Sequence, residues 1–130
     1  KMTGRLEYLG ERPDLAAAHK LFGNAMIIGM VAIMADVLAL AAASGVAAED
    51  AIARLKSLDA NGMVARRGTA MAKGDFTASF ELTMARKDVG LMLDTIGAGP
   101  KAALPAIAAR MDELIAAGHG AKDASALGLL

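Results

Sequence analysis

Residues 15–44, LAAAHKLFGNAMIIGMVAIMADVLALAAAS, decide the fold class of this chain. The stretch is rich in alanine and methionine, which favour helices, and Gly45 follows it as a residue type that commonly ends them. We therefore predict one helix from Leu15 to Ser44, about 45 Å long at 1.5 Å per residue. Asp14 lies immediately before this helix and is expected to be its N-cap.

The centre of this helix is apolar on every side, because residues 25–35 include no polar side chain. A membrane span is the alternative, since residues 21–43 have the length to cross a bilayer. Asn24 and Asp36 within the span, the lack of a Trp/Tyr belt and the lack of a basic flank beyond it argue against the membrane. We favour a helix surrounded by other helices, some of them from a second subunit.

The composition of the whole chain supports an all-α domain that does not bind nucleic acid. Of the 130 residues 55% are apolar, yet only four are aromatic and nine are methionine. The 14 basic and 14 acidic side chains balance, so no electrostatic footprint for nucleic acid or an anionic membrane is present. The absence of cysteine excludes disulfides, thiol catalysis and Cys-based zinc sites, and it suits a reducing cytoplasm.

The rest of the chain is predicted to form shorter helices around the long one. Glycine-containing breaks at residues 61–62, 74–75, 97–100 and 118 separate them. Asp123 or Ser125 can cap one further turn near the end. The expected helices are residues 48–58, 63–73, 81–96 and 104–117.

The first residues have a different pattern. Residues 5–10, RLEYLG, alternate polar and apolar side chains and end on glycine, which is typical of a short strand. No partner strand follows, so we expect its sheet to lie in an upstream part that the chain lacks.

The long helix carries the first candidate site. Lys20 and Asn24 are four residues apart and share a face, and Gly23 leaves room for a ligand to approach the backbone. Lys20 is either a snorkelling lysine with its ammonium in water or a general acid/base held in a cleft. Asp36 lies on the opposite side, so we expect it to pair with an arginine or a helix N-terminus, or across a dimer.

The second candidate site is Arg86-Lys87-Asp88, which is either a solvated helix face or part of a cleft. Phe80 lies eight residues before Asp88 and could reach the same cleft from a loop. No glycine-rich phosphate loop is present. The two histidines, His19 and His119, have no third ligand at metal spacing, so no metal site is expected.

Taken together and in order, these residues resemble the C-terminal helical domain of the β-hydroxyacid dehydrogenase family. That family includes 3-hydroxyisobutyrate dehydrogenase, tartronate semialdehyde reductase and glyoxylate/succinic semialdehyde reductases, and more distantly 6-phosphogluconate dehydrogenase. The matching segments are Tyr8-Leu9-Gly10, Lys20-Leu21-Phe22-Gly23-Asn24, Ala35-Asp36-Val37-Leu38, Gly74-Asp75-Phe76 with Phe80 and Lys87-Asp88-Val89, and Gly118 to Leu127.

The resemblance implies a role for each matched residue. Lys20 would be the catalytic proton donor or acceptor, Asn24 would bind substrate, and Lys87 would contact an NAD or NADP cofactor. Phe80 and Asp88 would line the substrate cleft. Residues 1–12 would be the end of a missing N-terminal Rossmann domain, and residues 13–130 a substrate-binding and dimerisation domain like that of 6-phosphogluconate dehydrogenase.

The expected function is therefore that of half an NAD(P)-dependent oxidoreductase, which interconverts a small β-hydroxy acid and its aldehyde or keto form. The isolated chain is expected to be inactive, cytoplasmic and a homodimer or higher homo-oligomer. A non-catalytic helical dimerisation module is the alternative. An imine reductase is a third possibility, against which Lys20 argues because relatives with that chemistry usually lose the lysine.

Overall fold

The computed structural model describes residues 12–130. The strand predicted at residues 5–10 lies outside the described residues, as does nearly all of the predicted end of an upstream Rossmann domain at residues 1–12.

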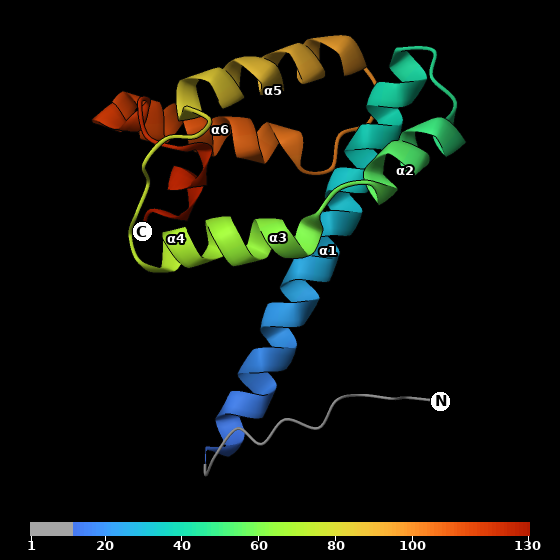
Figure 1. The fold of residues 1–130 in the computed structure, drawn as a ribbon. Helices are drawn as coiled ribbons and strands as arrows, with labels where there is room; N and C mark the ends of the chain where they lie inside the picture. Colours follow the sequence, from blue (N-terminus) through green and yellow to red (C-terminus); the bar gives the residue numbers. More distant parts are fainter. Residues whose placement is uncertain (1–11) are drawn as a thin grey trace, which may run out of the picture.

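The predicted all-α fold is confirmed for residues 12–130, which form helices and no strand (Figure 1). An isolated antiparallel bridge joins Glu81 to Asp123. The elements in chain order are α1 (Pro13–Ala43), α2 (Ala48–Lys56), α3 (Ala60–Met63), the π-helical turn η1 (Val64–Gly68), α4 (Thr69–Ala72), α5 (Leu82–Ile96), α6 (Leu104–Leu114), the π-helical turn η2 (Ile115–His119) and the 3-10 helix η3 (Ala124–Gly128).

The hydrophobic core lies between α5, α6 and η3. Apolar residues at helical spacing give each of α5 and α6 one buried face, and these faces pack together. Leu82 is completely buried, as is Ala126 from η3. We call this cluster the helical core; its buried residues are Leu82, Ala85, Val89, Ile96, Leu104, Ala108, Met111, Leu114, Ala124 and Ala126.

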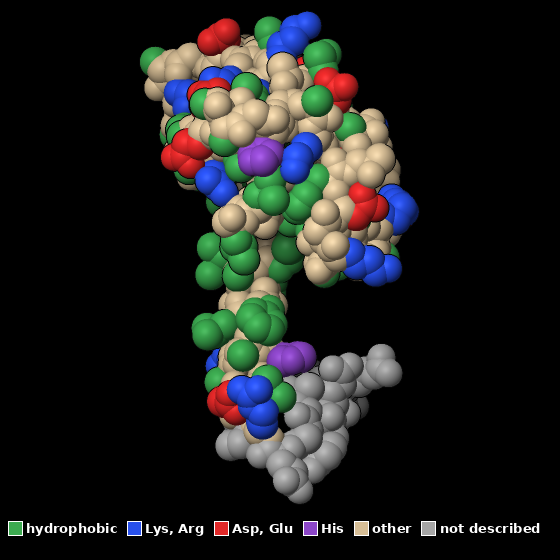
Figure 2. Space-filling view, turned by 90° about the vertical axis from the view of Figure 1, so that its left-hand side faces the viewer, with side chains coloured by type: hydrophobic (Ala, Val, Ile, Leu, Met, Phe, Trp, Pro, Cys, Tyr) green, Lys and Arg blue, Asp and Glu red, His purple; other side chains and the backbone are tan. Residues whose placement is uncertain are grey.

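Within residues 12–130, the long helix α1 is covered at one end. Its last turns pack against α2 and α5, while its N-terminal half projects away from the other helices (Figure 1). We call residues 14–35 of α1 the stem, and none of them is buried. Figure 2 shows hydrophobic side chains on the stem without cover by the described part of the chain. Among the described residues, the predicted wrapping by shorter helices therefore reaches only the end of α1 that follows Ala35.

The segment Asp14–Ala43 is long and apolar enough to cross a membrane by length and composition, with a mean hydropathy of 2.3 in its most apolar window. A long helix that other protein chains or domains cover has the same properties. Length and hydropathy alone therefore do not identify a membrane span.

Two local predictions are wrong. Asp14 is not the N-cap of α1, because the helix already begins at Pro13 and Arg12 takes the cap position. Proline is favoured at the first helical position, where its missing N–H costs no hydrogen bond. The Asp14 carboxylate instead accepts hydrogen bonds from the Arg12 guanidinium.

The predicted break at residues 61–62 is also displaced. Asn61 and Gly62 lie inside α3, whose N-cap is Asp59, and the Asp59 carboxylate accepts a hydrogen bond from the Gly62 N–H at 2.8 Å. A Cβ atom on residue 62 would lie 1.9 Å from Asp59 Oδ2. Glycine at this position therefore makes room for the cap.

Two predicted helix ends are close to the observed ones. Gly45 follows α1 with a φ of 70°, as expected for a terminating glycine. The helix predicted to reach residue 117 ends at Leu114 and continues as the π-helical turn η2, in which Gly118 has a φ of 92°.

Asp123 caps the start of η3 by accepting a hydrogen bond from the Ser125 N–H, which confirms the prediction of a capped final turn.

Candidate functional site

The first predicted pair, Lys20 and Asn24, lies on the exposed stem. Both residues are exposed, and their four-residue spacing places them on one face of the helix. A Cβ on Gly23 would have no neighbouring atom within 4 Å, so the helix backbone is open to an approaching molecule there. The rings of His19 and Phe22 lie in a tilted arrangement on the same helix, with their centroids 5.6 Å apart. The stem therefore presents an ammonium and an amide on an uncovered apolar helix.

The second predicted group lies at the helical core. Phe80 ends the loop before α5, while Lys87 and Asp88 lie one to two turns into that helix. Lys87 is exposed and, among residues 12–130, has no ion-pair partner. Its neighbour Arg86 does have one, because the Arg86 Nε donates to Asp112 Oδ1 at 2.8 Å. Of these two adjacent cations, Lys87 is the one available to a ligand.

Asp123 holds Phe80 in place from the end of the chain. Its carboxylate is buried and accepts hydrogen bonds from the Phe80 and Ser79 N–H groups at 3.0 and 3.1 Å. The Ser79 hydroxyl and the Ser125 N–H donate to the same carboxylate. Burial raises the pKa of Asp123, but the hydrogen bonds from Ser125, Phe80 and Ser79 outweigh it and hold that pKa well below its ordinary value.

Asp36 is the other buried carboxylate, and it ties α1 to α6. Its oxygens accept hydrogen bonds from the N–H groups of Ala102, Ala103 and Leu104 at 2.5, 2.9 and 2.8 Å. This geometry confirms the predicted pairing with a helix N-terminus. Burial raises the pKa of Asp36, but these donors, together with the charge of Lys101, leave it below its ordinary value.

A single chain does not bring the two groups together. Lys20 lies sixteen residues before Asp36, which is about 24 Å along a helix axis, and Asp36 marks the start of the covered part of α1. In Figure 1 the stem and α5 lie at opposite ends of the molecule. Lys20 and Asn24 therefore belong to one surface, and Phe80, Lys87 and Asp88 to another.

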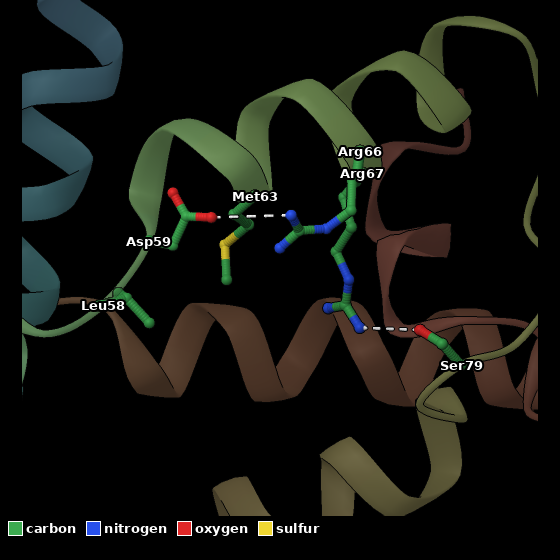
Figure 3. A pocket seen from close by; sticks show the side chains of 6 residues that line it. All are labelled: Leu58, Asp59, Met63, Arg66, Arg67 and Ser79. Atoms are coloured by element: carbon green, nitrogen blue, oxygen red, sulfur yellow. Dashed lines mark hydrogen bonds and ion pairs between the residues drawn. The ribbon is translucent and has the colours of Figure 1, made fainter.

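Sequence reasoning missed two features. The first is that Asp123 orders the loop that carries Phe80; an Asp-x-Ser sequence at residues 123–125 indicated a cap but not the distant partners. The second is a pocket in which Arg66 and Arg67 lie together (Figure 3). Within residues 12–130 no group of three metal-binding side chains occurs.

The described residues form a helical domain in which a buried cluster lies between α5, α6 and η3 and a long apolar helix projects from it. The family model described as NAD-binding of NADP-dependent 3-hydroxyisobutyrate dehydrogenase matches residues 15–129. The chain therefore belongs to this family, within the β-hydroxyacid dehydrogenases, and is a 3-hydroxyisobutyrate dehydrogenase-like NAD(P)-binding domain. A search of curated proteins finds no significant match.

Proposed function

We propose that the chain is the helical substrate-binding part of an NAD(P)-dependent enzyme that interconverts a small β-hydroxy acid and its aldehyde or keto form. The observation that carries this proposal is the pair of Lys20 and Asn24 on one exposed face of the stem, beside the open backbone at Gly23. Polar side chains are rare on this helix, and these two share a face at the spacing that lets them contact one small molecule.

Lys20 is proposed as the proton donor in reduction and the acceptor in oxidation. An ammonium beside a carbonyl oxygen protonates that oxygen as negative charge develops on it, which is general acid catalysis. The Asn24 amide, one turn further on, has both donor and acceptor atoms and can orient a hydroxyl or carboxylate of the substrate. Phe80 and Asp88 are proposed to line the same cleft once it is complete.

Lys87 fits a contact with the cofactor, because its ammonium is exposed and lacks an ion-pair partner among residues 12–130. The nicotinamide ring of a bound NAD or NADP would supply or accept the hydride. We propose that an upstream Rossmann domain holds most of the cofactor.

A second copy of the chain is proposed to cover part of the stem and to complete the cleft. Large exposed apolar side chains occur on most sides of this helix, which advances about 100° per residue: Leu21, Phe22, Met26, Ile27, Ile28, Met30, Val31, Ile33 and Met34. Contiguous apolar surface of this kind usually marks a site that another protein or a membrane covers. Lys20, Asn24 and Asp36 favour protein over lipid as the cover, and we propose a cytoplasmic homodimer or higher homo-oligomer.

The test is the Lys20→Ala variant of the full-length enzyme, assayed for NAD(P)H oxidation with succinic or tartronic semialdehyde. We expect kcat to fall about 10²–10⁴-fold, the usual contribution of a general acid, while the circular dichroism spectrum and Tm stay unchanged. Lys56→Ala, which removes an exposed lysine from the last turn of α2, is the matched control and should keep full activity. Retained activity in the Lys20 variant would overturn the role of Lys20.

A non-catalytic dimerisation module is the second candidate, and the wide separation of the stem from α5, the helix that carries Lys87, favours it (Figure 1). In that case the full-length protein would form dimers but would not bind a nicotinamide cofactor. Fluorescence titration with NADH and NADPH separates the two candidates, because binding of either cofactor excludes the module.

A further inference from the structure

A pocket of about 410 Å³ lies between the start of α3, the π-helical turn η1 and the loop before α5 (Figure 3). Its volume falls within the roughly 300–1,000 Å³ typical of small-molecule sites. None of Lys20, Asn24, Phe80, Lys87 and Asp88 lines it, although Ser79 in its lining adjoins Phe80. The lining residues are Leu58, Asp59, Met63, Arg66, Arg67 and Ser79.

Two adjacent arginines reach this pocket from η1. Figure 3 shows the Arg66 guanidinium directed toward Asp59 and the Arg67 guanidinium directed toward Ser79. In a regular α-helix neighbouring side chains do not face each other. The π-helical turn Val64–Gly68 is wider, so successive side chains are closer together around its axis, and such turns are frequent at functional sites.

Both guanidiniums keep donors for a ligand. Arg66 Nη1 lies 3.7 Å from Asp59 Oδ2, and the Arg66 side chain makes no hydrogen bond with residues 12–130. Arg67 Nη2 lies 3.4 Å from the Ser79 Oγ and 3.5 Å from Asp123 Oδ2. These distances are longer than the about 2.7–2.9 Å of a charge-assisted hydrogen bond, so neither arginine is engaged in a short ion pair.

The two nearby carboxylates are occupied by other donors. The Asp59 carboxylate accepts the Gly62 N–H, and Asp123 is buried and accepts four hydrogen bonds from Ser79, Phe80 and Ser125. Asp59 keeps its negative charge and lines the pocket, whereas Asp123 is buried and lies outside the lining. The lining therefore carries two guanidiniums against one carboxylate, and its net charge is positive. An arginine fork matches the planar geometry of two oxygens on one carbon or phosphorus.

The pocket also has an apolar side. Leu58 and Met63 are 58% and 45% exposed, and both line it. Covering these side chains with a hydrocarbon group would remove apolar surface from water. The lining thus combines a cationic end with an apolar wall.

We propose that this pocket binds a small organic oxyanion, with its carboxylate or phosphate between Arg66 and Arg67 and a short hydrocarbon part against Leu58 and Met63. The site is independent of the proposed reaction at Lys20. Glycine at position 62 leaves space for the Arg66 guanidinium, because a Cβ there would also lie 2.8 Å from Arg66 Nη1.

The experiment is a titration of the ¹⁵N-labelled chain followed by amide chemical shifts, with butyrate, inorganic phosphate and butylammonium as probes. Butyrate or phosphate should shift amides of residues 58–67 and 79, whereas butylammonium, which has the same hydrocarbon chain and the opposite charge, should not. Binding of only one anion would identify the head group as a carboxylate or a phosphate.

Variants assign the binding to the two arginines. Arg66→Gln and Arg67→Gln should each weaken the affinity roughly tenfold, through loss of a charge-assisted contact. Arg66→Gln is the cleaner variant, because the ion pair of Arg66 within residues 12–130 is with exposed Asp59, whereas that of Arg67 is with buried Asp123. Arg12→Gln is the matched control, since Arg12 is also exposed and paired with an aspartate, and it should leave the affinity unchanged.

Three results would overturn the proposal. They are pocket amides that do not shift with either anion, unchanged affinity in both pocket variants, or an equal response to butylammonium. Equal shifts near Arg12 and in the pocket would show unspecific attraction of anions to surface arginines, and would overturn it as well.

Discussion

The stem and the helical core are built from similar apolar residues, but their surroundings differ completely. In the core, Leu82 and Ala126 are fully buried against α6 and its neighbours. On the stem, Ile28 is 68% exposed although its sequence context is more apolar. Hydrophobic content therefore predicts that a segment will be covered, but the partner that covers it is decided by where the rest of the chain packs. The core therefore stabilises the fold of one chain, whereas the stem's apolar side chains gain no such stabilisation from the rest of residues 12–130.

The largest effect on stability is expected from the core variant Leu82→Ala. Removing a fully buried leucine side chain leaves a cavity and should lower the free energy of unfolding by about 2–5 kcal/mol. Urea denaturation measures the change. Leu91→Ala on the same helix is the matched control, since Leu91 is 57% exposed, and it should cost less than about 0.5 kcal/mol. Equal costs would contradict the assignment of α5's buried face.

Asp36→Ala tests the junction between the two regions. The change removes the cap of α6 and leaves the buried Leu104 N–H without a partner, so we expect a loss of about 2–3 kcal/mol. Asp36→Asn keeps an acceptor oxygen and should cost less. If both variants unfold at the wild-type urea concentration, the contact does not hold α1 to α6.

The buried carboxylates predict that the core is sensitive to acid. The folded pKa of Asp123 lies well below its ordinary value of 3.8, so the stability that it contributes is complete above that value and is lost as the pH falls toward the folded pKa. Unfolding free energies measured from pH 7 down to pH 2 should decrease below about pH 4. Asp123→Asn should flatten this part of the profile; a profile of unchanged steepness would contradict the role of Asp123.

The smallest effect is expected on the stem, where Ile28→Ala should change the unfolding free energy of a dilute, monomeric chain by less than about 0.5 kcal/mol. If a second copy covers the stem, the variant should weaken self-association, and the difference in Tm from wild type should grow with protein concentration. Light scattering and thermal melts at several concentrations measure this. A large cost at the dilution where the chain is monomeric would mean that the stem is already covered within one chain.

Much of the fold could be predicted from residue patterns. Apolar spacing located α5 and α6, and Gly45 located the end of α1, because these features depend on neighbours in the sequence. The exact residues at which the helices begin were less predictable. Asp14 and Asp59 are both aspartates near a helix start, and only Asp59 is a cap, because Pro13 moves the start of α1 forward.

The candidate site was predicted less completely. The spacing of Lys20 and Asn24 places them on one face, and this follows from helix geometry alone. The link from Asp123 to Phe80 spans 43 residues, and no local pattern encodes such a contact. The pocket at Arg66 and Arg67 was missed for the same reason, since Ser79 reaches it from a separate loop.

The helical class, the family and the shared face of Lys20 and Asn24 follow from the residues alone, because periodicity and residue order are local properties. Three features follow from packing in three dimensions: Asp36 caps α6, Asp123 orders the Phe80 loop, and the rest of residues 12–130 leaves the stem uncovered. These outcomes depend on which distant backbone groups and surfaces meet when the chain packs. Buried carboxylates and exposed apolar side chains are costly unless such partners are supplied, so their partners are set by the fold as a whole.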